Sequence, residues 1–309
     1  MSSSAYLRLR TASLIVAPSL VFTATACSRQ SAEMDVHADH RMAPAGTMTA
    51  MAFHSDPALP AAATDVADRL ARSPRHGEFV TIRTGASDSV RAWVVYPERA
   101  TKAPVVVVVH EIYGLSTWVR GVADQLAADG FIAIAPDLLT GKATPAAGSD
   151  TLTQVAATTA IRTLAAFDVQ RQLAAVGAYG MALPAAAGRY GTVGFCWGGS
   201  SSFAHAVASP RGLGGAVVYY GTSPESASLA SVTAPVLGLY AADDARVNAT
   251  VPPADSAMRA LGKSFDPHTF AGAGHGFLRQ QDGRNGANLA ASRQAWPLTL
   301  AFLRANLDR

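Results

Sequence analysis

Residues 191–200, GTVGFCWGGS, place a cysteine among glycines directly after a short apolar run. Cys196 is the centre of a G-x-C-x-G pattern, which has the spacing of the G-x-S-x-G nucleophile elbow with sulfur in place of oxygen. At such a sharp strand-to-helix turn, the residues two positions before and after the nucleophile lie against backbone and must be small. The pattern therefore predicts either a nucleophilic thiol at the N-terminus of a helix or a buried structural cysteine.

A nucleophile at this turn needs a base, and the base needs a group that orients it. In the chain order of nucleophile, acid and histidine, the acid falls after Pro235–Tyr240, where Asp243 and Asp244 are adjacent. The side chains of adjacent residues point in different directions, so only one of the two can face the histidine. His275 follows the strand predicted at Ser264–Phe270, and the glycines around it suit a tight loop at the sheet edge.

Other histidines fit the base less well. His205 falls nine residues into the helix after the elbow, where a packed or surface helical residue is expected. His110 ends a valine strand, where a structural hydrogen-bonding role is expected instead of catalysis.

These side chains need a sheet whose strands end at one edge. Five consecutive valines, Val105–Val109, predict a parallel strand buried on both faces. The other predicted strands are Glu78–Thr84, Val90–Pro97, Phe131–Ala135, Gly191–Phe195, Gly215–Tyr220, Pro235–Tyr240 and Ser264–Phe270. Helices are predicted at residues 116–129, 151–178 and 285–307, besides the one after the elbow. This alternation predicts one doubly wound, mostly parallel α/β sheet, in which ligands bind at the carboxyl ends of the strands.

Three segments resemble the signature of the dienelactone hydrolase family. They read HEIYGL, GFCWGG and GHGF, at residues 110–115, 194–199 and 274–277. The resemblance covers residues 77–309 and implies a single catalytic domain of the α/β-hydrolase fold with a Cys-Asp-His triad. Members carry their acid in a D-x-x-V/I turn, which is similar to the segment from Asp244 to Val247 and favours Asp244 over Asp243.

The resemblance also implies roles for residues around the triad. Glu111 would hold the resting thiol and take up its proton when substrate enters, because a carboxylate close to a thiol keeps the sulfur protonated. The backbone N–H groups of Ile112 and Trp197 would form the oxyanion hole.

Substrate binding is implied for two further residues. Arg279 matches a position that binds the substrate carboxylate, and Tyr113 lies in the HEIYGL segment beside Glu111. The family's second anion-binding arginine has no counterpart after Asp137, where only Lys142 could substitute.

The N-terminus has the pattern of an export signal. Residues 1–26 combine Arg8 and Arg10 with an apolar stretch and small residues, so a signal peptide is expected there. Cys27 would then be either the first residue after an ordinary A-x-A site or the lipidated residue of a lipobox. Residues 27–76 are expected to form a flexible linker. The predicted protein is periplasmic or attached to the cell envelope, with Cys196 as a lone thiol in an oxidising compartment.

The composition of the chain indicates which partners are expected. The chain has 309 residues, a net charge of +3 and no run of Lys or Arg, so nucleic acid is not an expected partner. We expect hydrolysis of a small carboxylic ester or lactone, with no cofactor, no metal, a monomer by default and a membrane contact only through a lipid anchor. The alternatives are a non-catalytic binding protein on a hydrolase scaffold and thiol redox chemistry, although no resolving cysteine is available.

Overall fold

The computed structural model describes residues 56–142, 144 and 147–308, which lie in one compact unit. The signal peptide expected at 1–26, the lipidation considered for Cys27 and the part of the expected linker up to residue 55 lie outside the described residues. The strands are β1 (Gly77–Arg83), β2 (Ser89–Val95), β3 (Ala103–Val109), β4 (Ile132–Asp137), β5 (Ala186–Phe195), β6 (Leu213–Tyr219), β7 (Val236–Asp243) and β8 (Phe265–Gly274). The α-helices are α1 (Val66–Ala71), α2 (Thr117–Ala128), α3 (Gln154–Ile161), α4 (Ala166–Ala182), α5 (Trp197–Ala208), α6 (Ala245–Asn248), α7 (Val251–Ala260) and α8 (Ala287–Leu307).

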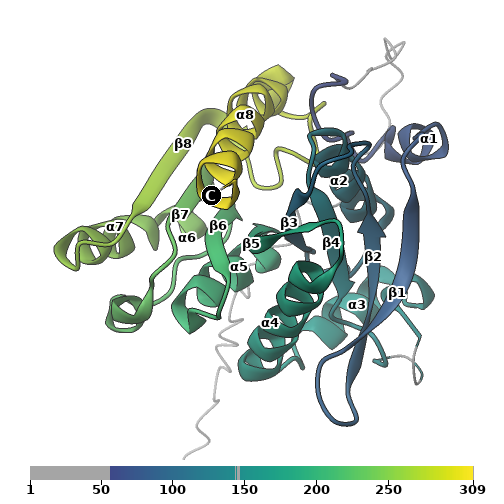
Figure 1. The fold of residues 1–309 in the computed structure, drawn as a ribbon. Helices are drawn as coiled ribbons and strands as arrows, with labels where there is room; N and C mark the ends of the chain where they lie inside the picture. Colours follow the sequence, from purple (N-terminus) through teal and green to yellow (C-terminus); the bar gives the residue numbers. More distant parts are fainter. Residues whose placement is uncertain (1–55, 143, 145–146, 309) are drawn as a thin grey trace, which may run out of the picture. The chain divides into compact units, whose positions relative to one another are not determined.

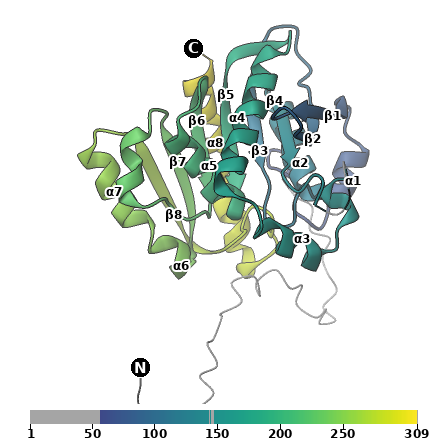
Figure 2. The same ribbon diagram turned by 90° about the horizontal axis from the view of Figure 1, so that it is seen from below.

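The eight strands form one sheet in the order β1-β2-β4-β3-β5-β6-β7-β8 (Figure 1). The leading hairpin β1–β2 is antiparallel, β2 joins β4 antiparallel, and every pair from β4 to β8 is parallel. Seen from below, α1 lies at the β1 end of the sheet and α7 at the β8 end (Figure 2). This is a doubly wound, mostly parallel α/β sheet, as the strand–helix alternation predicted.

The valine strand β3 shows how the sheet is buried. Val106 and Val108 belong to a core cluster with residues of α2 and α8, whereas Val105, Val107 and Val109 pack with residues of α4. All five valines are fully buried, because successive side chains of a strand point to opposite faces and helices cover both. The carboxyl end of this strand leads directly into His110 and the HEIYGL segment.

The helix predicted at 151–178 is two helices, α3 and α4, and the prediction of one continuous helix was wrong. Ile161 at the end of α3 packs with Ile112 and Leu139, whereas Val169 and Leu173 of α4 pack against the sheet. Two different packing faces require a change of direction, and the chain turns at residues 162–165. Periodicity alone did not show this turn because neither Gly nor Pro marks it.

The chain before β1 packs on the domain where it is described. Leu59, Ala61 and Val66 are buried in the same core cluster as α2. The Trp118 indole N–H donates to the carbonyl of Ala61, at 3.1 Å. Residues 56–76 therefore contribute to the core of the unit, although this stretch had been expected to belong to a flexible linker.

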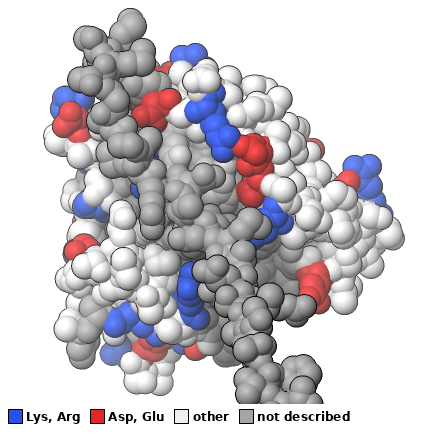
Figure 3. Space-filling view, turned by 180° about the vertical axis from the view of Figure 1, so that it is seen from behind, with Lys and Arg blue, Asp and Glu red and all other residues white. Residues whose placement is uncertain are grey.

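On the face of the molecule that Figure 3 shows, positive and negative side chains are interspersed among uncharged ones. In the part of the chain that the structure describes, the helices are too short or too polar to span a bilayer.

Candidate active site

The turn from β5 to α5 has the backbone of a nucleophile elbow. Cys196 lies between the two elements with φ 54° and ψ −117°, a conformation that non-glycine residues rarely adopt. Its side chain is 6% exposed, and its N–H donates to the carbonyl of Tyr219 on β6, at 3.0 Å. The strained turn thus holds the sulfur at the carboxyl edge of the sheet, at the N-terminus of a helix.

The glycines of the pattern are required by close backbone approach. A Cβ on Gly194 would overlap the carbonyl of Gly198, and a Cβ on Gly198 would overlap the carbonyls of Val109 and His110. Because both obstacles are main-chain atoms, no side-chain rotation can relieve the overlap. The structure therefore shows the close backbone contact that the G-x-C-x-G spacing predicted.

The variant Gly194→Ala is expected to lower the thermal unfolding midpoint by about 5–10 °C, since overpacking against backbone costs about 1–3 kcal/mol or slightly more. Gly188→Ala is the matched control, because Gly188 lies on the same strand and a Cβ there meets nothing within 4 Å. Thermal unfolding by circular dichroism measures both variants. Equal midpoints would contradict the steric account of the elbow.

The histidine and the acid of the sequence analysis meet at the same edge. His275 follows β8, and its Nδ1 donates to Asp244 Oδ2 at 2.6 Å. Asp244 is the N-cap of α6, where its other oxygen, Oδ1, accepts from the Val247 N–H at 3.4 Å. Both side chains are nearly buried, at 8% and 7% exposure, so the pair is shielded from water.

The remaining ring nitrogen of His275 faces the thiol, since the imidazole is also hydrogen-bonded to Cys196. Burial by itself would lower the pKa of His275. The hydrogen bonds to Asp244 and Cys196 outweigh this effect and raise that pKa to about 10. The site therefore favours a protonated imidazole, which is the partner that a thiolate needs.

The adjacent aspartate points elsewhere. Asp243 is paired with Arg284 and its side chain is 61% exposed. The structure thus places Asp244, and not Asp243, against His275.

Glu111 is a carboxyl group buried beside these residues. It lies two residues after the end of β3 and is 2% exposed, and neither of its oxygens has a hydrogen-bond partner among the described residues. Arg279 lies near it, with Nε at 3.5 Å from Oε2. Burial raises the pKa of Glu111, although the charges of Arg279 and His275 offset part of the effect. Its carboxyl group therefore accepts a proton more readily than that of an exposed glutamate.

The contact between Glu111 and a resting thiol, implied by the family resemblance, is absent among the described residues. The thiol is hydrogen-bonded to His275 instead, while both oxygens of Glu111 are without a hydrogen bond. The cysteine side chain has a single torsion, so its sulfur cannot face His275 and Glu111 at the same time. In this structure the sulfur faces His275. The structure therefore shows the arrangement in which the thiol is already beside its base.

The HEIYGL segment is fixed by His110. Its Nε2 accepts from the Leu138 N–H at 3.1 Å, so its Nδ1 donates to the Glu111 carbonyl, at 2.6 Å. The ring stacks on Trp197 with centroids 5.7 Å apart. His110 thus ties the loop of Ile112 to the elbow, which is the structural role that its place after β3 predicted.

The two residues expected to form the oxyanion hole belong to the elbow and to the loop after β3. Trp197 is the first residue of α5, so its N–H is one of the donors that a helix N-terminus leaves open. Ile112 is buried in the loop that His110 holds against β4 and the elbow.

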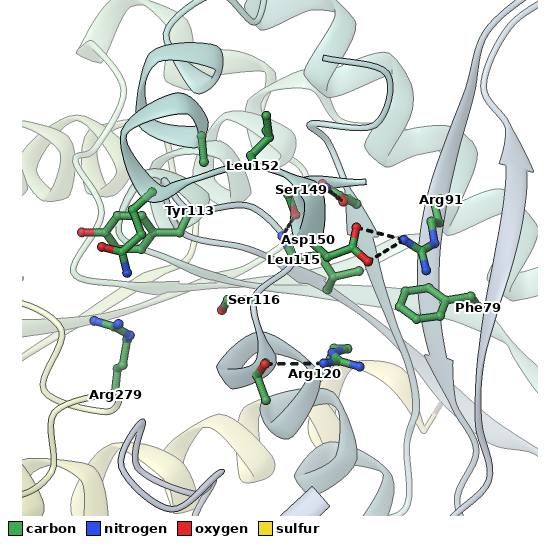
Figure 4. A pocket seen from close by; sticks show the side chains of 14 residues that line it. Phe79, Arg91, Tyr113, Leu115, Ser116, Arg120, Ser149, Asp150, Leu152 and Arg279 are labelled. Atoms are coloured by element: carbon green, nitrogen blue, oxygen red, sulfur yellow. Dashed lines mark hydrogen bonds and ion pairs between the residues drawn. The ribbon is translucent and has the colours of Figure 1, made fainter. Parts of the chain in front are cut away.

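Two residues were missed by the sequence analysis. Tyr220, directly after β6, is buried at φ 39° with its ring 5.1 Å from that of His275, and its hydroxyl has no hydrogen-bond partner in the described part of the chain. Burial and the nearby Glu111 and Cys196 raise its pKa well above the usual value. Its place at the end of a predicted central strand was the available signal. The second residue is Arg120, which lines a pocket together with Arg279 (Figure 4).

The described residues were also compared with the side-chain clusters that bind metal ions. Within residues 56–142, 144 and 147–308, no group of three or more His, Cys, Asp or Glu side chains could hold a metal ion.

The site combines a thiol on a strained strand-to-helix turn, an aspartate after β7 and a histidine after β8. Together they form a nucleophile–acid–base array at one edge of a doubly wound sheet. This combination defines the α/β-hydrolases, whose triad follows the same chain order.

Comparisons with known proteins identify the family within this class. The model of the dienelactone hydrolase family matches residues 90–307. A Salmonella typhi protein for which carboxymethylenebutenolidase activity has been suggested is 30% identical over 235 residues, 72% of this chain and 85% of that protein. The carboxymethylenebutenolidase of Pseudomonas putida is 29% identical over 221 residues, 69% of this chain and 91% of its own.

A solved structure agrees with this assignment. The crystal structure of a suggested dienelactone hydrolase from Klebsiella pneumoniae superposes with a TM-score of 0.64 at 25% identity, covering 74% of this chain and 98% of the other. The chain belongs to the dienelactone hydrolase family, and it is a hydrolase.

Proposed function

We propose that the protein hydrolyses a carboxylic ester or lactone through a thioester intermediate on Cys196. The contact of the thiol with His275, which in turn is held by Asp244 at 2.6 Å, is the observation that carries the proposal. The thiol proton passes to His275, the Cys196 sulfur attacks the carbonyl carbon, and the carbonyl oxygen takes the negative charge. The N–H groups of Trp197 and Ile112 would stabilise this oxyanion.

The intermediate then collapses with loss of the alkoxide, which takes a proton from His275. For a lactone the leaving alkoxide stays attached to the acyl group, so ring opening and acylation are the same step. A water molecule then gives a proton to His275 and attacks the thioester, which releases the acid and returns the proton to the thiol. Asp244 orients the imidazole and stabilises its protonated form throughout.

Glu111 and Arg279 would act at the entry of substrate. Arg279 supplies a guanidinium for a carboxylate, and its ring neighbour is Tyr113, with the guanidinium carbon 5.7 Å from the ring centroid. When a substrate anion engages Arg279, Glu111 loses its counter-ion and its affinity for a proton increases. Glu111 would then compete with His275 for the thiol proton when the sulfur turns toward it.

The test is hydrolysis of a dienelactone and of a simple aryl acetate by the purified protein. We expect turnover of both substrates. Loss of dienelactone absorbance measures the first reaction, and release of the phenol measures the second. Turnover of the aryl ester alone would retain the triad and exclude dienelactone as substrate. Turnover of neither by folded protein would contradict the proposal and favour a non-catalytic binding protein.

A further inference from the structure

The strand that leads to His275 has little support of its own. β8 is the last strand of the sheet, so only β7 pairs with it, and this pairing is irregular between Ala241 and Asp243 (Figure 1). Gly272 and Gly276, on either side of His275, both have positive φ, at 71° and 76°. Glycines restrict the backbone little, so the position of the imidazole depends on contacts from outside the strand.

One side chain of α8 supplies such contacts on both sides of the histidine. Asn288 lies in the first turn of the helix and is 2% exposed. Its Oδ1 accepts from the Gly274 N–H at 3.0 Å, and its Nδ2 donates to the Gln280 carbonyl at 2.7 Å. The first partner directly precedes His275 and the second directly follows Arg279, so one amide closes the loop that carries both residues.

The orientation of this amide is decided by its partners. A main-chain N–H can only donate and a carbonyl can only accept, so an Asn288 turned by 180° would place donor against donor and acceptor against acceptor. Aspartate has the right length but lacks the donor, and glutamine has both groups on a longer stem. Asparagine is therefore the residue that holds both backbone groups at once.

The rest of the loop is a compact turn attached to the same helix. The Gln280 N–H donates to the Gly276 carbonyl at 2.9 Å. The hydroxyl of Ser292, one turn further along α8, lies 2.8 Å from the Asn288 carbonyl and 3.3 Å from the Phe277 carbonyl. Two side chains of α8 thus hold the loop, and Asn288 is the one bonded next to the histidine.

A small displacement of this loop would change the contacts of the triad. His275 contacts Asp244 at 2.6 Å through one ring nitrogen and the thiol of Cys196 through the other. The imidazole has only two side-chain torsions, so both contacts depend on where the backbone before it is placed. Hydrogen bonds weaken steeply with poor geometry. The bond to the Gly274 N–H therefore helps to keep the imidazole between its acid and the nucleophile.

We propose that Asn288 is a positioning residue of the catalytic site, which fixes His275 through Gly274 and Arg279 through Gln280. The proposal rests on the proposed function for the roles of His275 and Arg279. Asn288 acts through main-chain groups, so its loss should change the reactivity of the thiol by moving the imidazole.

The experiment measures alkylation of Cys196 by iodoacetamide as a function of pH in the purified protein. In the wild type we expect alkylation to continue below the pH at which an ordinary thiol ionises, because protonated His275 pairs with the thiolate. Asn288→Ala should lower the rate at pH 7 by about fivefold or more and shift the profile to higher pH. It should also lower kcat for p-nitrophenyl acetate by about tenfold or more, because the base is misplaced. Asn288→Ser is expected to give the same losses, and it replaces the alanine variant if that variant does not fold.

Two further variants separate positioning from stability. Asn288→Asp keeps an acceptor for the Gly274 N–H but places an oxygen against the Gln280 carbonyl, so it should be less stable and still be alkylated within about threefold of wild type. Asn306→Ala is the matched control, because this asparagine of α8 donates to the Phe302 carbonyl at 2.8 Å and lies beside Gly215, near the amino end of β6. Its thermal unfolding midpoint should fall, while alkylation and kcat stay within about twofold of wild type.

The alkylation rate needs no ester turnover, so it distinguishes failure of this proposal from failure of the proposed function. A loss of alkylation in Asn288→Ala or Asn288→Ser that Asn288→Asp recovers would support the positioning role, even if no ester were hydrolysed. Three results would overturn it: a rate within about twofold of wild type without the amide, an equal loss in Asn306→Ala, or a loss of about tenfold or more in Asn288→Asp.

Discussion

Replacing Cys196 by alanine is expected to lower kcat for ester hydrolysis at least about a thousandfold, because the attacking sulfur is removed and no other described cysteine can replace it. The fold should be kept, since alanine loses only the sulfur and meets the same φ of 54° as cysteine does. Steady-state release of p-nitrophenol, measured beside the thermal unfolding midpoint, tests both statements. Residual activity above a tenth of wild type would exclude Cys196 as the nucleophile.

A second variant at this position separates nucleophilicity from structure. Cys196→Ser restores the G-x-S-x-G form of the elbow and offers a hydroxyl in the same place. We expect measurable turnover that is well below wild type, because the serine hydroxyl is a weaker nucleophile than a thiol that is paired with protonated His275.

Asp244→Asn is expected to lower kcat/KM by about a thousandfold or more, because the amide cannot stabilise the imidazolium and holds the wrong tautomer of His275. The carboxylate at 2.6 Å is one cause of the raised pKa of His275, so that pKa should fall in the variant. The protonated imidazole is then lost at lower pH, and the thiolate loses its partner. Alkylation of Cys196 by iodoacetamide at pH 7 should accordingly become slower.

Asp243→Asn is the matched control for this effect. Asp243 is next in sequence and carries the same charge, but it is 61% exposed and paired with Arg284. Since exposed ion pairs contribute little, activity and alkylation rate should stay within about twofold of wild type. A loss equal to that of Asp244→Asn would show that the acid of the triad had been chosen wrongly.

The sequence allowed the sheet and the elbow to be predicted because both depend on local patterns. The five valines of β3 predict burial on both faces, and the Gly194 and Gly198 positions predict backbone contact, which the structure shows. The order of cysteine, acid and histidine along the chain predicted that the acid and His275 meet at one edge of the sheet, and the structure shows His275 in contact with Asp244 there. Between the two adjacent aspartates, however, residue type alone did not decide, and the family pattern was needed.

What the sequence could not predict depends on distant packing. The turn between α3 and α4 follows from Ile161 and Val169 packing in different clusters. Arg120 had no distinguishing signal, because an arginine in the first turn of a helix is ordinary until the helix is placed beside Arg279. The rotamer of the thiol, toward His275 and away from Glu111, is likewise decided by the assembled site.

The segment before β1 has a consequence for how the enzyme can be shortened for expression. Besides its buried side chains, it is joined to the loop of the catalytic histidine, where the Ala63 N–H donates to the Arg279 carbonyl at 2.9 Å and the Gln281 amide to the Pro60 carbonyl at 2.7 Å. A chain that began at Gly77 would leave both loop groups without these partners. A shortened enzyme should therefore begin no later than Asp56, and any tag or surface attached at that end would be mechanically connected to the loop that carries His275 and Arg279.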